Sequence, residues 1–506
     1  MLISLIGSVA RAEDPPPELR ALVKRGTKVA VTYYKTFATC AHLVDANLRI
    51  QHVKNLFCVR GGPTTVEVAV TDFNATLKVG QKYRLCNGNS YQSCSPLLTY
   101  TEESLYTVTP LATNVAITPG PLNVARDGRA TFQVTANAGF ALLPTVQTDC
   151  AAGSWTASAY TTGPITASCS VRFKAVRKSL YVLGGEVGST LSHFVLDNLG
   201  VATPLGSPLF VGEGPSSMVW VDPAGAFAYV VSNSGVYQYA LDESDGHPTP
   251  AASFPYGAKV SIVNGKAPAT FDRAGRTYYA ASPGLRAFDV DAGTGALVDT
   301  GMAAPVRFEP DSIVTHPNGG LVFVLSHVGS TCAVSTFKVD RVKRELTELY
   351  MHSFSGVMTS FNIDRAGNFI HLTSDNGTIL TLAVDAASGV LTPAAQPFSF
   401  GAPAYALSLT FNSAGTFAYL LDVAANRMVV LPANPTNGTF GNATQTYAVN
   451  GPTGFALDAS GKTAYLTSYG YATLSQLTVA ANGTLSLRRT VPAGSQPRGI
   501  AVRPSK

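Results

Sequence analysis

The sequence of 506 residues predicts an all-β protein: a C-terminal seven-bladed β-propeller closed by its terminal strand, preceded by two small disulfide-bonded β domains. Three observations predict this fold class. Val, Thr, Tyr and Phe alternate between turns rich in Gly, Pro and Asn, which is typical of short strands. A pattern recurs about every 45 residues after residue 178. Six of the seven cysteines precede residue 170.

Charge is scarce and evenly distributed. Charged residues make up only 13% of the chain, against about 25% in an ordinary globular domain. The net charge of +5 includes no basic block. Because nucleic-acid binding needs clustered Lys and Arg to displace phosphate counterions, we expect no nucleic-acid partner. No segment approaches the roughly 20 consecutive apolar residues that span a bilayer, so no transmembrane anchor is expected.

The first residues are typical of an export signal. Residues 1–12 end in Ala10-Arg-Ala12, a small-x-small pattern of the kind that signal peptidase cleaves. The apolar stretch is short and lacks a basic start, so we interpret it as a signal segment that is truncated or has a misassigned start. A proline run then opens an extended linker over 13–27. We therefore expect an exported protein, periplasmic or located outside the cell at its surface.

The cysteines indicate disulfides in the N-terminal part, which an oxidising compartment permits. We expect a small β domain over 28–105 and a second over 106–175. The spacings suggest the pairs Cys40–Cys58, Cys86–Cys94 and Cys150–Cys169, although the four cysteines before residue 105 allow three connectivities. A metal site is the alternative, but the chain contains no Cys-x-x-Cys motif. Cys332 is left over and is expected to be a small buried hydrophobe.

The repeats begin at residue 178. Each has alternating apolar residues, an Asp-Pro-x-Gly turn or a variant of it, and an aromatic and β-branched strand. Four short strands per repeat of this length are typical of a propeller blade. A blade cannot bury both of its faces alone, so neighbouring blades must stack around an axis. Successive turn glycines are 50, 44, 48, 48 and 46 residues apart: Gly225, Gly275, Gly319, Gly367, Gly415 and Gly461.

A seventh repeat is divided between the two ends of this region. The C-terminal Pro497-Arg-Gly-Ile-Ala-Val-Arg503 matches the start of a repeat, and Ser179-Leu-Tyr-Val-Leu183 matches its continuation. We predict that the two segments pair in one sheet, which makes seven blades over 178–506 and removes the open sheet edges. In the alternative, an open stack of repeats, the last strand has no partner.

The repeated unit Pro-x-x-apolar-x-apolar-Asp-Pro-x-Gly-x-x-x-Tyr-Val resembles the seven-bladed propellers of the lactonase family, which are related to bacterial 6-phosphogluconolactonase. The resemblance covers about residues 178–506 and implies the propeller fold. It also implies a lactonase-type activity, although the motif itself consists of turn and core residues. Asp and Pro set the turn, Gly supplies its left-handed residue, and Tyr or Phe packs between blades.

A second resemblance concerns residues 106–175. This unit contains Thr131-Phe-Gln-Val-Thr135 and ends in Cys169-Ser-Val-Arg-Phe173. It resembles the divergent internalin B-repeat modules of secreted bacterial proteins, which often carry such a cysteine pair. The resemblance implies a small spacer or interaction module on an exported bacterial protein.

Ligands of propellers usually bind at one mouth of the central channel. Loops leading into the innermost strand and loops leaving the second strand share that mouth, so both sets of loops supply candidate residues. The first set is Ser217, Asp311, Thr359, Tyr405, Thr453 and Arg498, and the second is Glu186, Asn233, His327, Asp375, Asp422 and Tyr469.

Three kinds of site are considered within these sets. Ester hydrolysis needs an oxyanion stabiliser and a general base. Arg498 is the candidate that polarises a lactone carbonyl, with Asp311 or His327 activating water. Its segment Pro497-Arg-Gly499 resembles a Pro-Arg-x segment of the lactonase family, but the family's histidine partner is missing. The candidates for ligand binding are Ser217, Thr359, Tyr405 and Tyr469, and those for a Ca²⁺ site, which needs oxygen ligands, are Glu186, Asp375 and Asp422.

Structural alternatives apply to the same residues. Arg498 can pair with a neighbouring blade, and Asp375 can form an Asx-turn with Asn376-Gly377. No cofactor is firmly implied. The preferred function is therefore non-catalytic: an exported bacterial scaffold that binds a protein or glycan, as in adhesion. The alternative is a secreted lactonase-type hydrolase that opens a cyclic ester. Convergence of Arg498, a carboxylate and His327 in one pocket would favour hydrolysis, whereas a wide mouth lined by Ser, Thr and Ala would favour binding.

Overall fold

The computed structural model describes residues 105–185, 189–212, 216–232, 235–254, 268–281, 284–401 and 405–503, together with the backbone of seven strands before residue 100. Every regular element in this part of the chain is a β-strand, which confirms the all-β fold class. The described residues thus include no helix with the length and apolar character needed to cross a membrane. The expected signal and linker over 1–27, and the site candidates Glu186 and Asn233, lie outside the described residues.

Before residue 100, the described strands are β1 (Lys28–Tyr33), β2 (Thr39–Asp45), β3 (Phe57–Val59), β4 (Thr64–Ala69), β5 (Lys82–Asn87), β6 (Ser93–Cys94) and β7 (Leu98–Thr99). β1 pairs with β4, and the other sheet has the order β3-β2-β5-β6, with β7 on β5. The register sets Cys40 opposite Cys58 and Cys86 opposite Cys94. The side chains of these four cysteines lie outside the described residues, so both disulfides stay predictions.

Two further sheets follow between residues 105 and 177. Their orders are β10-β8-β16-β12, with β13 on β16, and β14-β15-β11-β9. In β11, Phe132 and Val134 are buried while Thr131, Gln133 and Thr135 are exposed, as in a strand with one face on a core. Cys150 and Cys169 form a disulfide, which confirms this predicted pair. The strands are β8 (Leu105–Thr113), β9 (Val115–Thr118), β10 (Leu122–Ala125), β11 (Thr131–Ala136), β12 (Phe140–Leu142), β13 (Gln147–Thr148), β14 (Ser154–Thr156), β15 (Ala159–Thr161) and β16 (Cys169–Arg177).

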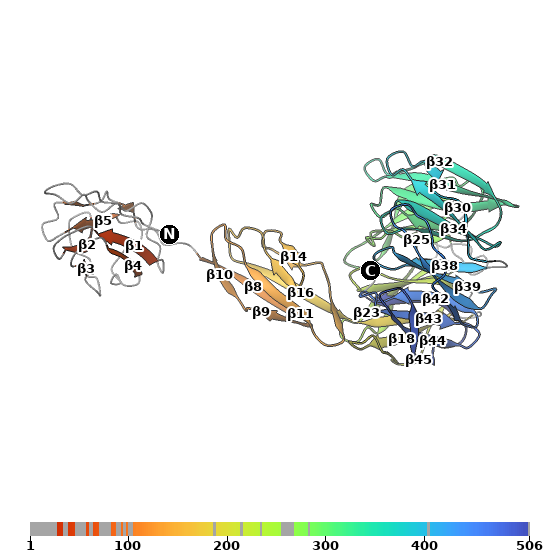
Figure 1. Cartoon of the computed structure of the whole chain (residues 1–506), viewed down its shortest axis with the longest axis horizontal. Coiled ribbons are helices and arrows are strands. Elements are labelled where there is room, and N and C mark those ends of the chain that lie inside the picture. The colour runs from red at the N-terminus through yellow and green to blue at the C-terminus, as the bar shows by residue number, and fades with distance from the viewer. Residues whose placement is uncertain are drawn as a thin grey trace. The chain divides into compact units, whose positions relative to one another are not determined.

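The chain divides into two compact units, one with residues 1–111, 117–133 and 147–171 and the other with 112–116, 134–146 and 172–506. The second unit contains the repeats (Figure 1). Its strands are β17 (Ser179–Gly184), β18 (Ser189–Leu196), β19 (Ala202–Pro204), β20 (Leu209–Gly212), β21 (Ser216–Val221), β22 (Phe227–Ser232), β23 (Gly235–Leu241), β24 (Pro248–Phe254), β25 (Ala269–Phe271), β26 (Thr277–Ala281), β27 (Leu285–Val290), β28 (Leu297–Ala304), β29 (Glu309–Thr315), β30 (Leu321–Val328), β31 (Thr331–Asp340), β32 (Glu345–Ser355), β33 (Met358–Ile363), β34 (Phe369–Ser374), β35 (Thr378–Val384), β36 (Leu391–Pro393), β37 (Phe398–Ser399), β38 (Ala406–Phe411), β39 (Phe417–Asp422), β40 (Arg427–Pro432), β41 (Gln445–Ala448), β42 (Pro452–Leu457), β43 (Thr463–Ser468), β44 (Thr473–Val479), β45 (Leu485–Pro492) and β46 (Pro497–Arg503).

These strands form antiparallel sheets that follow the repeats. In the described part of 179–503, seven sheets have the orders β46-β17-β18-β19, β21 to β24, β25 to β28, β29 to β32, β33 to β36, β38 to β41 and β42 to β45. β20 and β37 add to β18 and β35. Apart from the first, each sheet has its main strands in sequence order, so each repeat makes one sheet.

The turn between the first and second strand of a sheet is built by the Asp of the repeat. Asp222 accepts hydrogen bonds from the N–H groups of Phe227, at 2.6 Å, and of Ala224, at 3.0 Å. Gly225 has φ 65°, a left-handed conformation that residues with a Cβ rarely adopt. The same hydrogen bonding recurs at Asp272, Asp364, Asn412 and Asp458, and His316 Nδ1 takes the equivalent role. The repeat motif is therefore turn chemistry, as the sequence predicts.

Successive sheets share apolar cores. The innermost strands β46, β21, β25, β29, β33, β38 and β42 are neighbours in this order, and β42 again contacts β46. Between β21 and β25 the contact is the stacking of Trp220 on Phe271, with ring centroids 4.0 Å apart. Leu180 and Val182 of the first sheet share a core with Leu474 of the last. The shared cores thus link the last sheet to the first.

The C-terminal strand lies in the first sheet. β46 pairs antiparallel with β17, with Arg503 opposite Ser179 and Gly499 opposite Leu183. Arg503 is 1% exposed. It donates from Nε to the carbonyl oxygen of Gly225 at 2.8 Å and from Nη1 to that of Asp242 at 2.7 Å. Because both acceptors belong to the second sheet, this side chain ties the end of the chain to two sheets.

A tyrosine in the second strand joins many of the sheets to the next one. The hydroxyl of Tyr229 donates to the carbonyl of Gly295, in the outer turn of the following sheet, at 2.7 Å. Tyr465 of the last such strand donates to Gly200 in the first sheet at 2.8 Å. Tyr181 and Tyr419 make the equivalent bonds. We call this the latch position, which is occupied by Tyr181, Tyr229, Tyr279, Phe323, His371, Tyr419 and Tyr465.

Replacing Arg503 by Ala is expected to lower the free energy of unfolding by about 3 kcal/mol, because buried carbonyls lose their donor and each costs roughly 1–3 kcal/mol. Arg489→Ala removes an exposed arginine from β45 and serves as the matched control, with an expected change within about 0.5 kcal/mol. Urea denaturation measures both. Equal midpoints for the two variants would contradict the role given to Arg503.

His193 makes stability depend on pH. It is 6% exposed, stacks on Tyr181 with centroids 5.1 Å apart, and within the described residues neither ring nitrogen has a hydrogen-bond partner. Burial lowers the pKa of His193 to about 4, against a raising effect of the Asp245 carboxylate. Electrostatic interactions with His247 and Arg503 lower the pKa of His193 further.

The unfolded chain protonates this histidine near pH 6.5, whereas the folded chain does so only near pH 4. Stability present at pH 8 is therefore lost as the pH falls from about 6.5 to 4, by roughly 2 kcal/mol at pH 5. The variant His193→Phe keeps an aromatic ring on Tyr181, and we expect it to flatten this dependence. Urea denaturation at pH 8, 6 and 5 tests this, and an unchanged pH dependence in the variant would refute it.

Candidate functional site

A β-bulge recurs at the start of the innermost strands and positions the predicted site residues. Bulges re-aim the chain locally, often next to functional sites. The extra residues are Ser217, Asp311, Thr359, Leu407, Thr453 and Arg498. Five of the six candidates of the first predicted set thus occupy one structural position. Tyr405 lies two residues before the equivalent Leu407.

Asp311 and His327 form a dyad. Asp311 is the bulge residue of β29, and His327 lies near the end of β30 in the same sheet. His327 Nδ1 and Asp311 Oδ2 are 2.7 Å apart, and both side chains are partly exposed, 34% for His327 and 23% for Asp311. A carboxylate on Nδ1 orients an imidazole so that Nε2 is available as a base. The residue types and their spacing are those of a general base and the group that orients it.

The surroundings of the dyad are polar and partly desolvated. Cys332 on β31 lies opposite His327 and is buried. Burial raises the pKa of the Cys332 thiol, a backbone hydrogen bond at Met358 lowers it, and the charges of Asp311 and Asp375 raise it further. Burial, followed by the charge of Asp311, also raises the pKa of Tyr405. Cys332 therefore stays a thiol, unsuited to act as a nucleophile, as expected for a small buried residue.

Arg498 is on a different sheet. Its guanidinium lies over the ring of Tyr469, 5.9 Å from the centroid, and Gln496 Nε2 donates to the Tyr469 hydroxyl at 3.0 Å. On one side, β21 and β25 come between β46 and the dyad strand β29. The structure therefore brings Asp311 to His327 in one sheet, and brings Arg498, which lies on another sheet, to Tyr469.

The hydroxyls of Thr359, a predicted ligand-binding residue, and Thr453, a candidate of the first set, form hydrogen bonds within the protein. Thr359 is 1% exposed, and its hydroxyl lies 3.1 Å from that of Thr373. Thr453 makes the corresponding contact with Thr467, also at 3.1 Å, and donates to the carbonyl of Pro497. The side chain of Ser217 lies outside the described residues. At two bulge positions a threonine hydroxyl is thus paired with a second threonine of the same sheet, and the Asp–His dyad is a departure from this arrangement.

The two calcium candidates that lie in the described residues, Asp422 and Asp375, have different surroundings. Asp422 is fully buried, and its Oδ2 accepts a hydrogen bond from Arg427 Nε at 2.9 Å. Its Oδ1 accepts from the N–H of Tyr405 at 3.2 Å. A neighbouring guanidinium repels a second cation, so this carboxylate is a structural group. Asp375 is exposed in the turn between β34 and β35, as the alternative of a turn residue predicts.

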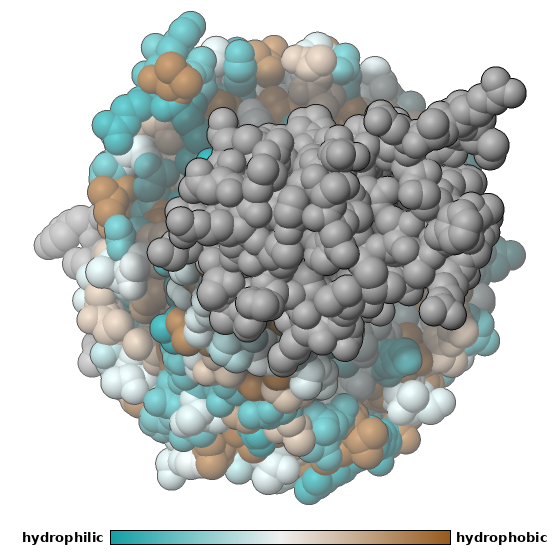
Figure 2. All heavy atoms as spheres, turned by 90° about the vertical axis from the view of Figure 1, so that its left-hand side faces the viewer, coloured by the Kyte–Doolittle hydropathy of each residue, from teal (hydrophilic) through white to brown (hydrophobic). Residues whose placement is uncertain are grey.

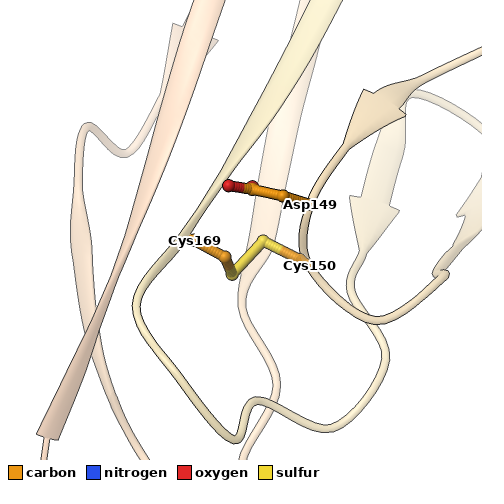
Figure 3. Close-up of side chains that lie close together, drawn as sticks. All are labelled: Asp149, Cys150 and Cys169. Carbon is orange, nitrogen blue, oxygen red and sulfur yellow. A yellow bond between two sulfur atoms is a disulfide. The ribbon is translucent and has the colours of Figure 1, made fainter.

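The structure also bears on the alternative that cysteines hold a metal ion. Asp149, Cys150 and Cys169 present ligand-type atoms within 4.8 Å of one another (Figure 3). The two sulfur atoms are bonded to each other, and Asp149 Oδ1 accepts hydrogen bonds from the N–H and hydroxyl of Ser170 at 2.5 and 3.0 Å. These hydrogen bonds lower the pKa of Asp149. The cluster is thus a disulfide beside a capped carboxylate.

Sequence reasoning missed the opposite end of the innermost strands, where two pockets lie. The available signals were departures from the repeat: Arg273 and Arg365 where other turns have Pro, Ser or Ala, and His371 at the latch position. On the outer surface seen in Figure 2, the described residues show hydrophilic and hydrophobic side chains interspersed, in keeping with the low charge of the chain.

Solved structures share the architecture of the repeat region. The periplasmic gluconolactonase of Pseudomonas aeruginosa aligns at 15% identity with a TM-score of 0.51, over 64% of this chain and 98% of that one. Candidate 6-phosphogluconolactonases of Bacteroides uniformis and Bacteroides fragilis align at 16% identity, with TM-scores of 0.54 and 0.53, over 64% of this chain and 99% and 97% of theirs. No protein-family model matches the chain, and no curated protein does. The repeat region therefore has a lactonase-like β-propeller fold.

Proposed function

We propose that residues 178–506 form a closed seven-bladed propeller that hydrolyses a cyclic ester, with His327 as general base and Asp311 as its orienting carboxylate. The 2.7 Å contact between His327 Nδ1 and Asp311 Oδ2 carries this proposal. Closure is supported by the pairing of β46 with β17 and by the apolar core that the last and first sheets share. The lactonase-like fold of the solved structures is consistent with a hydrolase of this kind.

The dyad supplies the proton transfers of the reaction. Nδ1–H of His327 donates to Asp311, which leaves Nε2 to take a proton from water. The water oxygen attacks the carbonyl carbon of the lactone, and the ring C–O bond then breaks. The imidazolium returns its proton to the departing alkoxide, so the product is a hydroxy acid. Arg498 lies in another sheet, and we leave it out of the reacting group.

A second candidate is the binding scaffold, an exported protein that holds a protein or glycan. It is favoured by the satisfied hydroxyls of Thr359 and Thr453 at the same mouth, which carry no reactive group. Export to the periplasm or cell surface is part of both candidates. The Cys150–Cys169 disulfide supports export, because such bonds persist in oxidising compartments. The internalin-like spacer over 106–175 belongs to this second candidate.

The test measures hydrolysis of unphosphorylated and phosphorylated sugar lactones by the wild-type chain and by His327→Gln. We expect a loss of about a hundredfold or more in kcat, because general base catalysis contributes 10²–10⁴-fold. Asp311→Asn should lower kcat less, because it removes the orienting charge and keeps the imidazole. The matched control is His352→Gln, a half-buried histidine on β32 of the same sheet, and it should keep the wild-type rate.

Two outcomes would overturn the hydrolase. One is a wild-type rate equal to the uncatalysed background with every lactone, which leaves the binding scaffold. The other is a rate that His327→Gln leaves unchanged. Arg498→Ala, measured in parallel, reports whether the cation of the other sheet takes part, since loss of an oxyanion donor costs about 10²–10³-fold in kcat.

A further inference from the structure

Two adjoining pockets lie at the mouth opposite the dyad. The dyad sits where an innermost strand begins, whereas these pockets lie where the innermost strands end. The larger, of about 380 Å³, is lined by the last residues of five innermost strands: Phe271, Thr315, Ile363, Phe411 and Leu457. Because five strands contribute equivalent residues, this pocket lies on the axis around which the sheets are arranged.

The larger pocket has both polar and apolar walls and carries two positive charges. Arg273 and Arg365 come from the first turns of the third and fifth sheets, and Arg273 Nη1 donates to the backbone carbonyl of Arg365 at 3.0 Å. Burial, followed by the charge of Arg365, lowers the pKa of Arg273. Thr315, Thr410 and Ser413 add hydroxyl-bearing side chains to the wall.

No anion of the described chain neutralises these charges. Asp364, which also lines the pocket, is 8% exposed and accepts hydrogen bonds from the N–H groups of Ala366 and Phe369. Among the described residues, no carboxylate forms an ion pair with Arg273 or Arg365. Two like charges that face one cavity favour an anionic ligand between them. Guanidinium groups bind carboxylates through paired N–H donors.

The smaller pocket, of about 230 Å³, is aromatic. Its walls include Phe369, Phe411 and Phe440, and the buried His371. The rings of Phe411 and Phe440 lie 5.1 Å from that of His371, measured between centroids. Burial lowers the pKa of His371 to about 3, so this ring is neutral near pH 7 and adds no charge to the wall. A dry cavity of about 150 Å³ can already bind benzene, so this pocket is large enough for an aromatic ring.

The two pockets adjoin. Asp364, Arg365, Phe411 and Ser413 line both of them, so the arginines of the larger pocket lie next to the aromatic wall of the smaller one.

The aromatic pocket exists because the repeat departs from its own pattern. At the latch position of four other sheets, the tyrosine hydroxyl donates to a glycine carbonyl of the next sheet, as Tyr419 donates to Gly483 at 3.1 Å. In the fifth sheet this position is His371, and the equivalent glycine carbonyl, of Gly438, accepts instead from Thr381 Oγ1 at 3.2 Å. A histidine is shorter than a tyrosine, and Gly438 and His371 both line the pocket. The two residues that a latch tyrosine would join therefore both lie on the wall of this pocket.

We propose that these adjoining pockets bind a small amphipathic carboxylate, with the carboxylate between Arg273 and Arg365 and an aromatic or short acyl body against Phe411 and Phe440. This site is separate from the dyad and does not depend on the hydrolase activity.

The first test is calorimetric titration of the full chain with 3-phenylpropionate. Saturable 1:1 binding is expected, with at least tenfold weaker binding of acetate, which lacks the apolar body, and of 3-phenylpropanol, which lacks the charge. Arg273→Gln and Arg365→Gln should each weaken 3-phenylpropionate binding tenfold or more. Arg276→Gln removes an exposed arginine that lies in the same turn as Arg273 but does not line either pocket, and it should bind as the wild type does.

The second test fills the aromatic pocket. His371→Tyr restores the phenol of the latch position, which can donate to the Gly438 carbonyl, so binding should be lost while the melting temperature is maintained or raised. Phe323→Tyr makes a corresponding change at the latch position of the fourth sheet and should leave binding intact. The proposal is refuted if the wild-type chain shows no saturable binding, or if Arg365→Gln binds 3-phenylpropionate as the wild type does. Arg273 and Arg365 lie in exposed turns, so their variants leave the apolar cores unchanged. They therefore test the binding site even if His371→Tyr fails to fold.

Discussion

The antiparallel pairing of β46 with β17 is the interaction on which the repeat region depends. It sets Arg503 opposite Ser179 and buries a guanidinium that bonds to carbonyls of the second sheet. Without it, the first sheet would expose the inner edge of β17, and the core that Leu180 and Val182 share with the last sheet would open. Unpaired sheet edges invite pairing with other chains, so a terminal strand in this place protects the fold as well as completing it.

Equivalent positions of the repeat hold different residues, with different contacts, in different sheets. The latch position is a tyrosine where it joins one sheet to the next, and its hydroxyl satisfies a buried glycine carbonyl. The bulge position holds a threonine paired with a second threonine in two sheets, at Thr359 and Thr453. A repeat array tolerates departures at such positions one sheet at a time, because each sheet contacts only its neighbours. The Asp311–His327 dyad and the pocket beside His371 are both departures of this kind.

The two ends of the innermost strands therefore have different chemistry. At the beginning of the strands, bulges recur and one sheet presents an imidazole held by a carboxylate. At their ends, two arginines and an aromatic wall line adjoining cavities. Proton transfer needs the first kind of arrangement, and recognition of an amphipathic anion needs the second. Because the chain carries few charges, the Asp311–His327 dyad at one mouth and the two arginines at the other are what distinguish the two mouths.

The sequence by itself determined the all-β class, the repeats, the turn chemistry of Asp222 and its equivalents, and the Cys150–Cys169 disulfide. These follow from alternation, glycine spacing and cysteine spacing, which act over short stretches of chain. It also indicated that Asp311 and His327 face one mouth, because a constant offset from the turn glycine corresponds to a constant place in a sheet. Only the tertiary structure decided that these two side chains meet, that the Arg498 guanidinium lies over the ring of Tyr469, and that Asp422 accepts a hydrogen bond from Arg427. It also decided that the pocket lined by His371 adjoins a pocket lined by Arg273 and Arg365. Those outcomes depend on which sheets are neighbours and on how side chains from distant repeats fill the space between them, and no local pattern encodes such distances.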